Sequence, residues 1–406
     1  MLSPQSAEIV RATLPVIGAK IDEITPIFYR RMFAAHPELE RDLFNRGNQA
    51  QGDQQRALAG AIAAYATLLV DADAPDVDAL LSRIAHKHAS LGIAPDQYPI
   101  VHQHLFEAIG QVLGEAATPE VVEAWEEVYW HMAHALIRIE QGLYARFGVE
   151  PHEVWQDLVV TDRRYESADT VAFTVARPDG TPLPQALPGQ YVSVQVPLAD
   201  GARQIRQYSL TGSPERPTWA FTVKAIREVE GLPAGEVSTY LHEEVFEGDT
   251  LHVSLPFGDL VLEEGDEPVL LVSAGIGCTP IIGMLHHLAR EGADRPVTVL
   301  HADRSPARHA HRRELADLVG RIDDARLHHW YEDLGSRAAT ETVRHGRIDL
   351  ASGDIDPKAE VYLCGPLPFM ESVRGQLAER GVPEERIHYE VFGPDTWIPH
   401  VDTAGV

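Results

Sequence analysis

The stretch VLLVSAGIGCTPIIGMLHHLA, residues 269–289, decides how the last third of the chain folds. Residues 269–274 suit a buried strand, a Gly-Ile-Gly loop follows, and apolar residues at helical spacing then predict a helix. Two further strand-then-helix pairs follow, VTVLHA before RRELADLVG and VYLCG before PFMESVRGQLAER. The alternation predicts an α/β domain over residues 266–406, with a parallel sheet covered by helices on both faces.

The residues before this region show two other patterns. Between residues 152 and 262, short alternating segments are separated by the turn sequences PDG, LPG, ADG and EGD, which predicts an antiparallel β-barrel. The clearest of these segments are QYVSVQV (190–196), QIRQYSL (204–210) and WAFTVKA (219–225). Residues 1–147 carry apolar side chains at helical spacing, so we expect an all-α domain there, joined to the barrel by a linker.

The composition excludes several classes of partner. The chain has 406 residues, and 34 Lys and Arg against 61 Asp and Glu give a net charge of −27, which repels nucleic acid and anionic membranes. Two cysteines, Cys278 and Cys364, are too few for a disulfide framework and suit a reducing compartment. The N-terminus lacks the basic start and apolar run of a signal peptide. We therefore expect a soluble cytoplasmic protein with no stable membrane association; its oligomeric state is open.

Three polar residues stand on apolar helix faces in the first domain. His88 continues the stripe of Val77, Leu81, Ile84 and Leu91, which directs His86 elsewhere. Tyr98 heads the stripe of a helix that opens at Pro95, and Glu140 shares a face with Ala133, Leu136 and Leu143. Taken one at a time, His88 and Tyr98 are typical of core positions, and Glu140 is typical of an ion pair between helices. Together they suit a metal-ligating histidine supported by a carboxylate, and so favour a metal or haem site.

A second group of residues predicts a small pocket. Tyr29 and Phe44 are aromatic, and Gln54 and Leu58 lie on one stripe of the helix that follows them. An apolar pocket with one hydroxyl and one amide suits the selective handling of bound O₂. The alternative is that Tyr29 and Phe44 are core aromatics.

The barrel region contains residues that suit a flavin. Arg206, Gln207, Tyr208 and Ser209 follow PGQY (188–191) and offer a guanidinium fork, a flat ring and a hydroxyl from one strand. The segment GEVST (235–239) opens a helix whose free N–H groups suit a pyrophosphate. The two segments in this order are a stronger signal than either alone.

The loop that opens the last domain suits a dinucleotide. In it, Gly275, Ile276, Gly277, Cys278, Thr279 and Pro280 link a strand to a helix, and we expect Thr279 as the helix N-cap and Pro280 as its first residue. The third glycine of the usual fingerprint is absent, so a tight strand-to-helix turn is the alternative. LCGP (363–366) repeats the pattern, which places both cysteines at the carboxyl ends of parallel strands.

These motifs together resemble one family over essentially the whole chain. FYRRMF, PELERDLFN, NQAQGDQQRALAGAIAAYA, IAHKHASLGI and QYPIVHQHL resemble the globin domain of the bacterial flavohaemoglobins, and the later motifs resemble their ferredoxin-reductase-type module. The resemblance implies that His88 is the proximal haem ligand, with Tyr98 and Glu140 behind it and Lys87 beside it. It also implies that Tyr29 is the distal hydroxyl at the bound gas and that Gln54 and Leu58 are the distal-helix positions.

For the reductase half, the resemblance implies the following sites. Tyr191 and Arg206 to Ser209 bind FAD, and Gly275 to Pro280 bind NAD(P)H. The segment of Val391, Phe392, Gly393 and Pro394 closes over the flavin, with Glu390 beside it. The chain departs from the family pattern in a longer loop at 226–236, in Cys278, in Val391 where the family often has Cys, and in the tail from Asp395.

The activity implied by the resemblance is that of an NAD(P)H-dependent nitric oxide dioxygenase. Such an enzyme holds haem b and FAD, takes NO and O₂ as substrates, and needs no obligatory protein partner. Two alternatives stay open: a sensor or store of O₂ or NO, and a flavin reductase for another acceptor such as a lipid hydroperoxide or quinone. The choice between NADH and NADPH is also open, because Arg304 and Arg308 suit either a 2′-phosphate or the surface.

Overall fold

The computed structural model describes residues 2–70, 77–213, 216–228, 233–292, 295–352 and 355–393. The chain divides into two compact units. One unit contains Met1–Trp155 with Pro197–Ile205, and the other contains Gln156–Val196 with Arg206–Phe392. Among the described residues, no helix is both long and apolar enough to cross a membrane.

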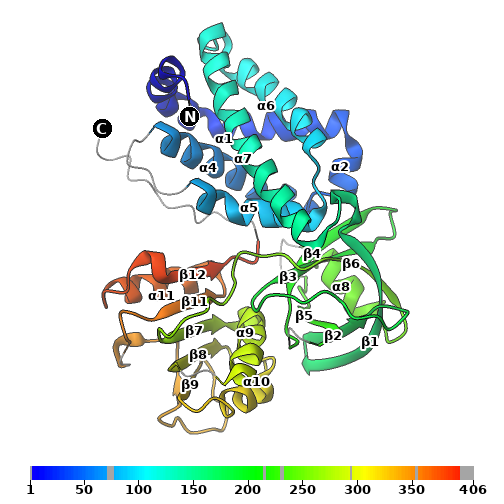
Figure 1. The fold of residues 1–406 in the computed structure, drawn as a ribbon, viewed down its shortest axis with the longest axis vertical. Helices are drawn as coiled ribbons and strands as arrows, with labels where there is room; N and C mark the ends of the chain where they lie inside the picture. The colour runs from blue at the N-terminus through cyan, green and yellow to red at the C-terminus, as the bar shows by residue number, and fades with distance from the viewer. Residues whose placement is uncertain are drawn as a thin grey trace. The chain divides into compact units, whose positions relative to one another are not determined.

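The first unit is built from α-helices, as predicted (Figure 1). Its helices are α1 (Pro4–Ala35), α2 (Pro37–Asp42), α3 (Arg46–Gln51), α4 (Asp53–Val70), α5 (Val77–Leu91), α6 (Tyr98–Leu113) and α7 (Pro119–Phe147). Helix α1 packs against α4, α6 and α7, and α5 packs against α7. The contact of α5, α6 and α7 around one core is what allows His88, Tyr98 and Glu140 to meet.

Local sequence signals fix the ends of the longest helices. The Ser3 hydroxyl accepts a hydrogen bond from the Ser6 N–H at 3.0 Å and so caps α1. Thr118 does the same for α7, and Gly148 ends α7 with a φ of 66°. Between these caps, α7 buries Ala133, Leu136, Glu140 and Leu143, which confirms the predicted stripe.

The second unit contains the predicted antiparallel barrel. Its strands are β1 (Trp155–Ser167), β2 (Thr170–Ala176), β3 (Tyr191–Pro197), β4 (Arg203–Ser209), β5 (Trp219–Lys224) and β6 (Thr250–Ser254), in the order β4-β3-β6-β1-β2-β5. A bridge between Leu210 and Phe221 joins the two outer strands and closes the sheet. Helix α8 (Glu236–Glu243) begins where the GEVST segment predicted a helix.

The second sheet of this unit is parallel throughout its described pairings, as predicted. Its strands are β7 (Val269–Ala274), β8 (Val297–Asp303), β9 (Ala325–Tyr331), β10 (Val343–His345), β11 (Glu360–Cys364) and β12 (Ile387–Glu390), in the order β10-β9-β8-β7-β11-β12. Strand β7 is buried at every position. Helices α9 (Cys278–Glu291) and α10 (Arg312–Val319) lie along one face and α11 (Leu367–Ala378) on the other (Figure 1).

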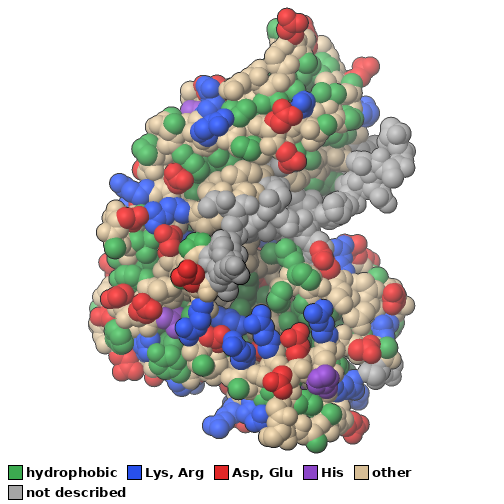
Figure 2. Space-filling model, turned by 180° about the vertical axis from the view of Figure 1, so that it is seen from behind, with side chains coloured by type: hydrophobic (Ala, Val, Ile, Leu, Met, Phe, Trp, Pro, Cys, Tyr) green, Lys and Arg blue, Asp and Glu red, His purple; other side chains and the backbone are tan. Residues whose placement is uncertain are grey.

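Charged side chains of both signs are spread over the surface. On the face drawn in Figure 2, acidic and basic side chains alternate with scattered hydrophobic ones. The net charge of −27 is therefore not gathered into one acidic patch on that face.

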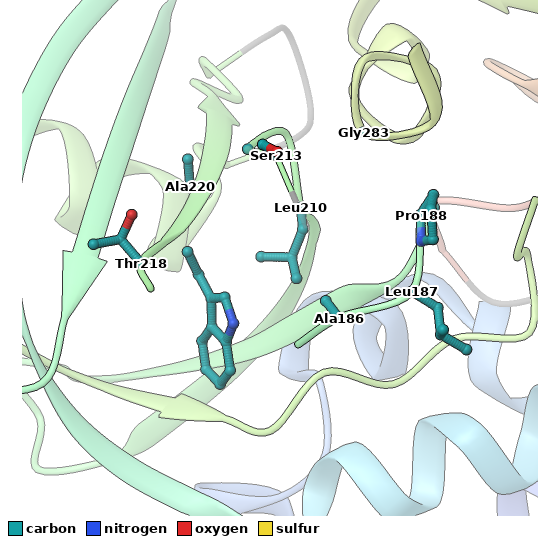
Figure 3. Close-up of a pocket in the computed structure, with 11 residues that line it drawn as sticks. Ala186, Leu187, Pro188, Leu210, Ser213, Thr218, Ala220 and Gly283 are labelled. Atoms are coloured by element: carbon teal, nitrogen blue, oxygen red, sulfur yellow. The ribbon is translucent and has the colours of Figure 1, made fainter. Parts of the chain in front are cut away.

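Helix α9 comes unusually close to the barrel at Gly283. A Cβ atom at this position would lie 2.6 Å from the carbonyl oxygen of Leu210. The same two residues border a shallow hollow (Figure 3) with a free volume of only about 10 Å³, far below the size of a ligand pocket. Gly283 therefore serves packing between helix and barrel.

We predict that Gly283→Ala destabilises the protein. Moving the Leu210 carbonyl to relieve the clash should cost about 1–3 kcal/mol, as overpacking does elsewhere. Calorimetric unfolding would measure the loss. Gly375→Ala in α11 is the control, because its Cβ would meet nothing within 4 Å and alanine favours a helix by up to ~1 kcal/mol. Equal effects of the two substitutions would contradict the packing role.

Candidate functional site

Three helices bring His88, Tyr98 and Glu140 into one hydrogen-bonded group. The Nδ1 atom of His88 lies 2.8 Å from Oε1 of Glu140, and the Tyr98 hydroxyl donates to the same oxygen at 2.6 Å. The Glu140 side chain is buried, with 2% of its surface exposed. Because an ionised carboxylate only accepts, His88 carries its proton on Nδ1 and presents the lone pair of Nε2.

The position of His88 suits a metal ligand. Its side chain is 32% exposed, whereas Ala85 and Ala89 beside it are fully buried. Since Nδ1 faces the buried Glu140, the open side of the ring carries Nε2. A histidine whose second nitrogen donates to a carboxylate is a common ligand arrangement in metal and haem sites. His86 has 9% of its surface exposed.

Tyr98 stays a neutral donor in this group. Burial raises the pKa of its hydroxyl well above the ordinary value, and the charge of Glu140 raises this pKa further. The proton between Tyr98 and Glu140 therefore remains on the tyrosine over the physiological pH range, and the carboxylate keeps its orientation toward His88.

Two tyrosines that the sequence analysis missed support this group. The Tyr129 hydroxyl donates to the backbone carbonyl of Tyr98 at 2.7 Å, and the Tyr144 hydroxyl donates to that of Ile93 at 2.8 Å. Both tyrosines lie on the α7 stripe of Glu140, eleven residues before it and four after it, so helical spacing was a signal that could have identified them. Glu140, Tyr144 and Ile93 also border an open hollow of about 1130 Å³.

Tyr29 and Phe44 lie together, as the pocket hypothesis requires. Their ring centroids are 5.9 Å apart in an edge-on arrangement, and Phe33 lies 5.3 Å from Phe44. Tyr29 is buried, and Leu58 is half-buried against the same core. The Gln54 side chain lies outside the described residues. Lys87, next to His88, is half-buried.

The side chains of strand β4 connect the barrel to the end of strand β12. The Gln207 amide donates to the Ser193 hydroxyl at 3.0 Å, and the Ser209 hydroxyl donates to Oε2 of Glu390 at 3.4 Å. The Tyr208 ring stacks on Phe221 with centroids 5.6 Å apart. Arg206 is half-buried and Tyr191 is buried. These contacts place the Ser209 hydroxyl beside the buried Glu390 carboxylate and fix Gln207 and Tyr208 within the barrel.

The predicted capping of the nicotinamide loop was wrong. Residues Gly275–Gly277 form a short 3₁₀ turn that continues directly into α9, so the helix begins at Cys278 with Gly277 as its N-cap. Thr279 instead donates its hydroxyl to the carbonyl of Ile276 at 3.0 Å. Pro280 is tolerated as the third helical residue because first-turn N–H groups lack intrahelical partners.

The two loop glycines have different roles. A Cβ at Gly277 would lie 2.4 Å from the Cys364 carbonyl oxygen, so Gly277 is needed for packing between the two loops. Gly275 has a φ of 54°, and a Cβ there would meet nothing within 4 Å. Gly275 is therefore the position at which a ligand can approach the backbone. Ile276 lies between them in the turn.

Both cysteines are buried and unreactive. Burial raises the pKa of the Cys278 thiol and of the Cys364 thiol, and the charge of Glu390 adds to the rise at Cys364. The thiols therefore remain protonated near neutral pH and do not act as nucleophiles.

The remaining predicted residues lie at or directly after the end of strand β12, apart from Arg308. Glu390 has 9% of its surface exposed and pairs with Cys364 in the sheet. Val391 is half-buried and Phe392 is 48% exposed, with Gly393 after them; Pro394 lies outside the described residues. Arg308 is 3.1 Å from Asp169 and so belongs to an ion pair.

Three family models match successive parts of the chain. The globin model matches residues 27–136, the oxidoreductase FAD-binding domain matches residues 157–261, and the oxidoreductase NAD-binding domain matches residues 271–375. The three matches fall in the order that the sequence patterns predicted.

Whole-chain relatives agree with this order. The chain is 43% identical over 403 residues to the flavohemoprotein of Bordetella pertussis, covering 97% of this chain and 99% of that protein. A solved flavohemoglobin from Malassezia yamatoensis, with bound FAD and heme, has a TM-score of 0.87 and 37% identity, covering 97% of this chain and 100% of that one. A flavohem-like FAD/NAD-binding domain of nitric oxide dioxygenase from Vibrio cholerae has a TM-score of 0.54 and 36% identity, covering 59% and 99%. The chain therefore belongs to the flavohemoprotein family.

Proposed function

We propose that the chain is an NAD(P)H-dependent nitric oxide dioxygenase that oxidises NO with O₂ to nitrate. The observation that carries this proposal is the buried Glu140 that holds His88 in one tautomer, in the same chain as a flavin and nicotinamide module. The nitric oxide dioxygenase from Vibrio cholerae, whose reductase half resembles this one, supports it. Haem supplies the iron at which NO and O₂ react, and FAD converts a two-electron hydride into single electrons.

The proximal residues make His88 a strong ligand. His88 would hold the haem iron through Nε2, and Glu140, which draws the Nδ1 proton toward itself, would increase electron donation from the ring. Tyr98 holds the carboxylate in place. A strongly donating ligand favours O₂ activation over reversible storage. Lys87 provides a cation beside this ligand.

The distal residues control the gas. The Tyr29 hydroxyl would donate a hydrogen bond to O₂ in the pocket, while Phe44 and Leu58 would restrict the volume of the pocket. Gln54 is proposed for the same pocket. The edge-on packing of Tyr29 and Phe44 supports this assignment, because it holds the phenol ring in one orientation.

The second unit delivers the electrons. Arg206 would bind the FAD phosphates, and Tyr191, Gln207, Tyr208 and Ser209 would hold the flavin together with Glu390 and the Val391 to Pro394 segment. The Gly275 to Pro280 loop binds NAD(P)H. The Ser209 to Glu390 contact supports this arrangement, since it brings the two flavin segments together.

We further propose three domains in one cytoplasmic chain: 1–147 for haem, 152–262 for FAD and 266–406 for NAD(P)H. The buried, protonated Cys278 and Cys364 suit a reducing compartment. Because haem and reductase segments lie in one polypeptide, electron delivery needs no obligatory protein partner.

The activity is tested with the purified holoprotein. Its absorption spectrum should show both haem and flavin bands, and NO should be consumed with NAD(P)H and O₂ while nitrate accumulates. A sensor or store would bind the gases without sustained nitrate production. A reductase for another acceptor would keep its full turnover after haem removal.

We predict that His88→Ala abolishes haem incorporation and that His86→Ala does not. Only His88 is placed on Glu140 through Nδ1 with its other nitrogen available for iron. Reconstitution with haem and the spectrum of the reduced protein measure the difference. Identical spectra for the two variants would refute the assignment.

We predict that Arg206→Ala loses FAD but retains haem. Removal of the guanidinium leaves the flavin phosphates without their bidentate partner. The flavin content after gel filtration and the binding of O₂ to the chemically reduced protein are the two measurements. Full flavin occupancy in this variant would contradict the role of Arg206.

We predict that Tyr29→Phe releases O₂ faster while flavin reduction by NAD(P)H is unchanged. Loss of a buried, charge-assisted hydrogen bond costs ~1–3 kcal/mol, which corresponds to a change in O₂ affinity of about fivefold to more than a hundredfold. NO is less polar in the same pocket, so its affinity should change less. Stopped-flow measurement of O₂ release decides: an unchanged rate would leave Tyr29 as a core aromatic.

A further inference from the structure

The segment His309-Ala310-His311, just before α10, contacts both the parallel sheet and the barrel. We propose that this segment, through the bond between His311 and Thr222, positions the nicotinamide-binding loop against the flavin-binding barrel. His311 would thus be a positioning residue for hydride transfer. The inference rests on the proposed function only in taking FAD and NAD(P)H as the ligands of this unit.

The first residue of the segment is fixed to the parallel sheet. The Nδ1 atom of His309 lies 2.8 Å from the Tyr331 hydroxyl on β9, and its ring stacks on His301 of β8 with centroids 3.8 Å apart. His301 in turn bonds Ser273 on β7 at 2.9 Å. Burial lowers the pKa of both imidazoles, so the stacked pair is uncharged at neutral pH. The segment therefore cannot shift independently of three neighbouring strands.

The second residue contacts the nicotinamide loop itself. The Ala310 carbonyl accepts from the thiol of Cys278 at 3.8 Å. Cys278 is the first residue of α9, directly after the Gly275–Gly277 turn. A displacement of Ala310 would therefore also move the Gly275–Gly277 turn, at which the dinucleotide is proposed to bind.

The third residue reaches the barrel. The Nε2 atom of His311 lies 2.8 Å from the Thr222 hydroxyl on β5, and its backbone N–H donates to Glu166 on β1 at 3.2 Å. Its Nδ1 lies 2.7 Å from Glu314 of α10. Both His311 and Thr222 are 2% exposed, so water does not compete for this bond.

The backbone of His311 adopts the geometry that this bridge requires. Its φ of 58° is the one positive value among the described non-glycine residues. In this conformation the ring contacts both Glu314 of α10 and Thr222 of β5. The residue next to Thr222 is Phe221, whose ring stacks on Tyr208 of the flavin motif. The segment thus connects the dinucleotide loop to the strand that supports the flavin side chains.

Hydride transfer is sensitive to such positioning. The nicotinamide carbon and the flavin nitrogen must approach to about 3–3.5 Å, and an error of about 1 Å lowers the rate by up to about a hundredfold. The pairs Arg308–Asp169 and Ser209–Glu390 are further contacts between the parallel-sheet region and the barrel. Among the described contacts, the His311–Thr222 bond joins residues that are next in sequence to both sides of the site. His311 follows Ala310, which contacts the nicotinamide loop, and Thr222 follows Phe221, which stacks on Tyr208 of the flavin strand.

The test compares Thr222→Val with Thr222→Ser in the full holoprotein. Valine keeps the volume and removes the hydroxyl, whereas serine keeps the hydroxyl. Anaerobic stopped-flow reduction of the flavin over a range of NADH concentrations gives a limiting rate and a Kd. We expect Thr222→Val to lower the limiting rate about tenfold, with weaker long-wavelength charge-transfer absorption between nicotinamide and flavin. NADH Kd and FAD content should remain at the parent values, and Thr222→Ser should restore the rate.

Two further variants keep the test decisive. Thr174→Val on β2 removes a hydroxyl from the neighbouring strand and should leave the rate unchanged. His311→Asn tolerates the left-handed conformation but is too short to reach Thr222, so it should reproduce the Thr222→Val defect even if that variant folds poorly. A parent-like rate in Thr222→Val, an equal loss in Thr174→Val, or loss of FAD would overturn the proposal. None of these measurements uses NO, so a negative result would overturn the positioning role of His311 without bearing on the dioxygenase activity.

Discussion

The interaction on which the first unit depends is the carboxylate of Glu140, buried between His88 and Tyr98. An ionised carboxylate in an apolar core is costly unless strong donors surround it. Here one donor comes from α5 and one from α6, while the carboxylate itself belongs to α7. Packing these three helices thus also fixes the tautomer of His88, so the fold itself determines which ring nitrogen is left to bind the proposed haem iron.

The parts of this site that could be predicted are those with helical spacing. His88 and Glu140 were identifiable because each places a polar group on an otherwise apolar face, and the Pro95 start placed Tyr98 at the head of its helix. Tyr129 and Tyr144 lie on the Glu140 stripe but were missed, because tyrosine is common in cores and its hydroxyl acceptors are backbone carbonyls. Carbonyl acceptors leave no pattern in the sequence.

The parts that could not be predicted depend on contacts between distant segments. Thr279 has the residue type of an N-cap, yet the preceding glycines form a turn that starts the helix two residues earlier than expected. Gly277 is required by the Cys364 carbonyl, 87 positions along the chain. Similarly, His311 pairs with Thr222 across 89 positions, and neither residue belongs to a motif. Local sequence preferences determine where helices and strands form, whereas long-range packing determines which residue makes each structural contact.

The two halves of the chain use polar groups for different ends. In the helical unit, one buried proton on His88 Nδ1 decides how strongly the other nitrogen donates electrons. In the second unit, contacts run from Ser273 through His301, His309 and His311 to Thr222. We propose that they set the distance between the nicotinamide and flavin rings. The donor strength of His88 depends on charge, whereas hydride transfer depends on the distance between the nicotinamide and flavin rings. A substitution that preserves charge but shifts position should therefore harm hydride transfer more than it harms the properties of the His88 ligand.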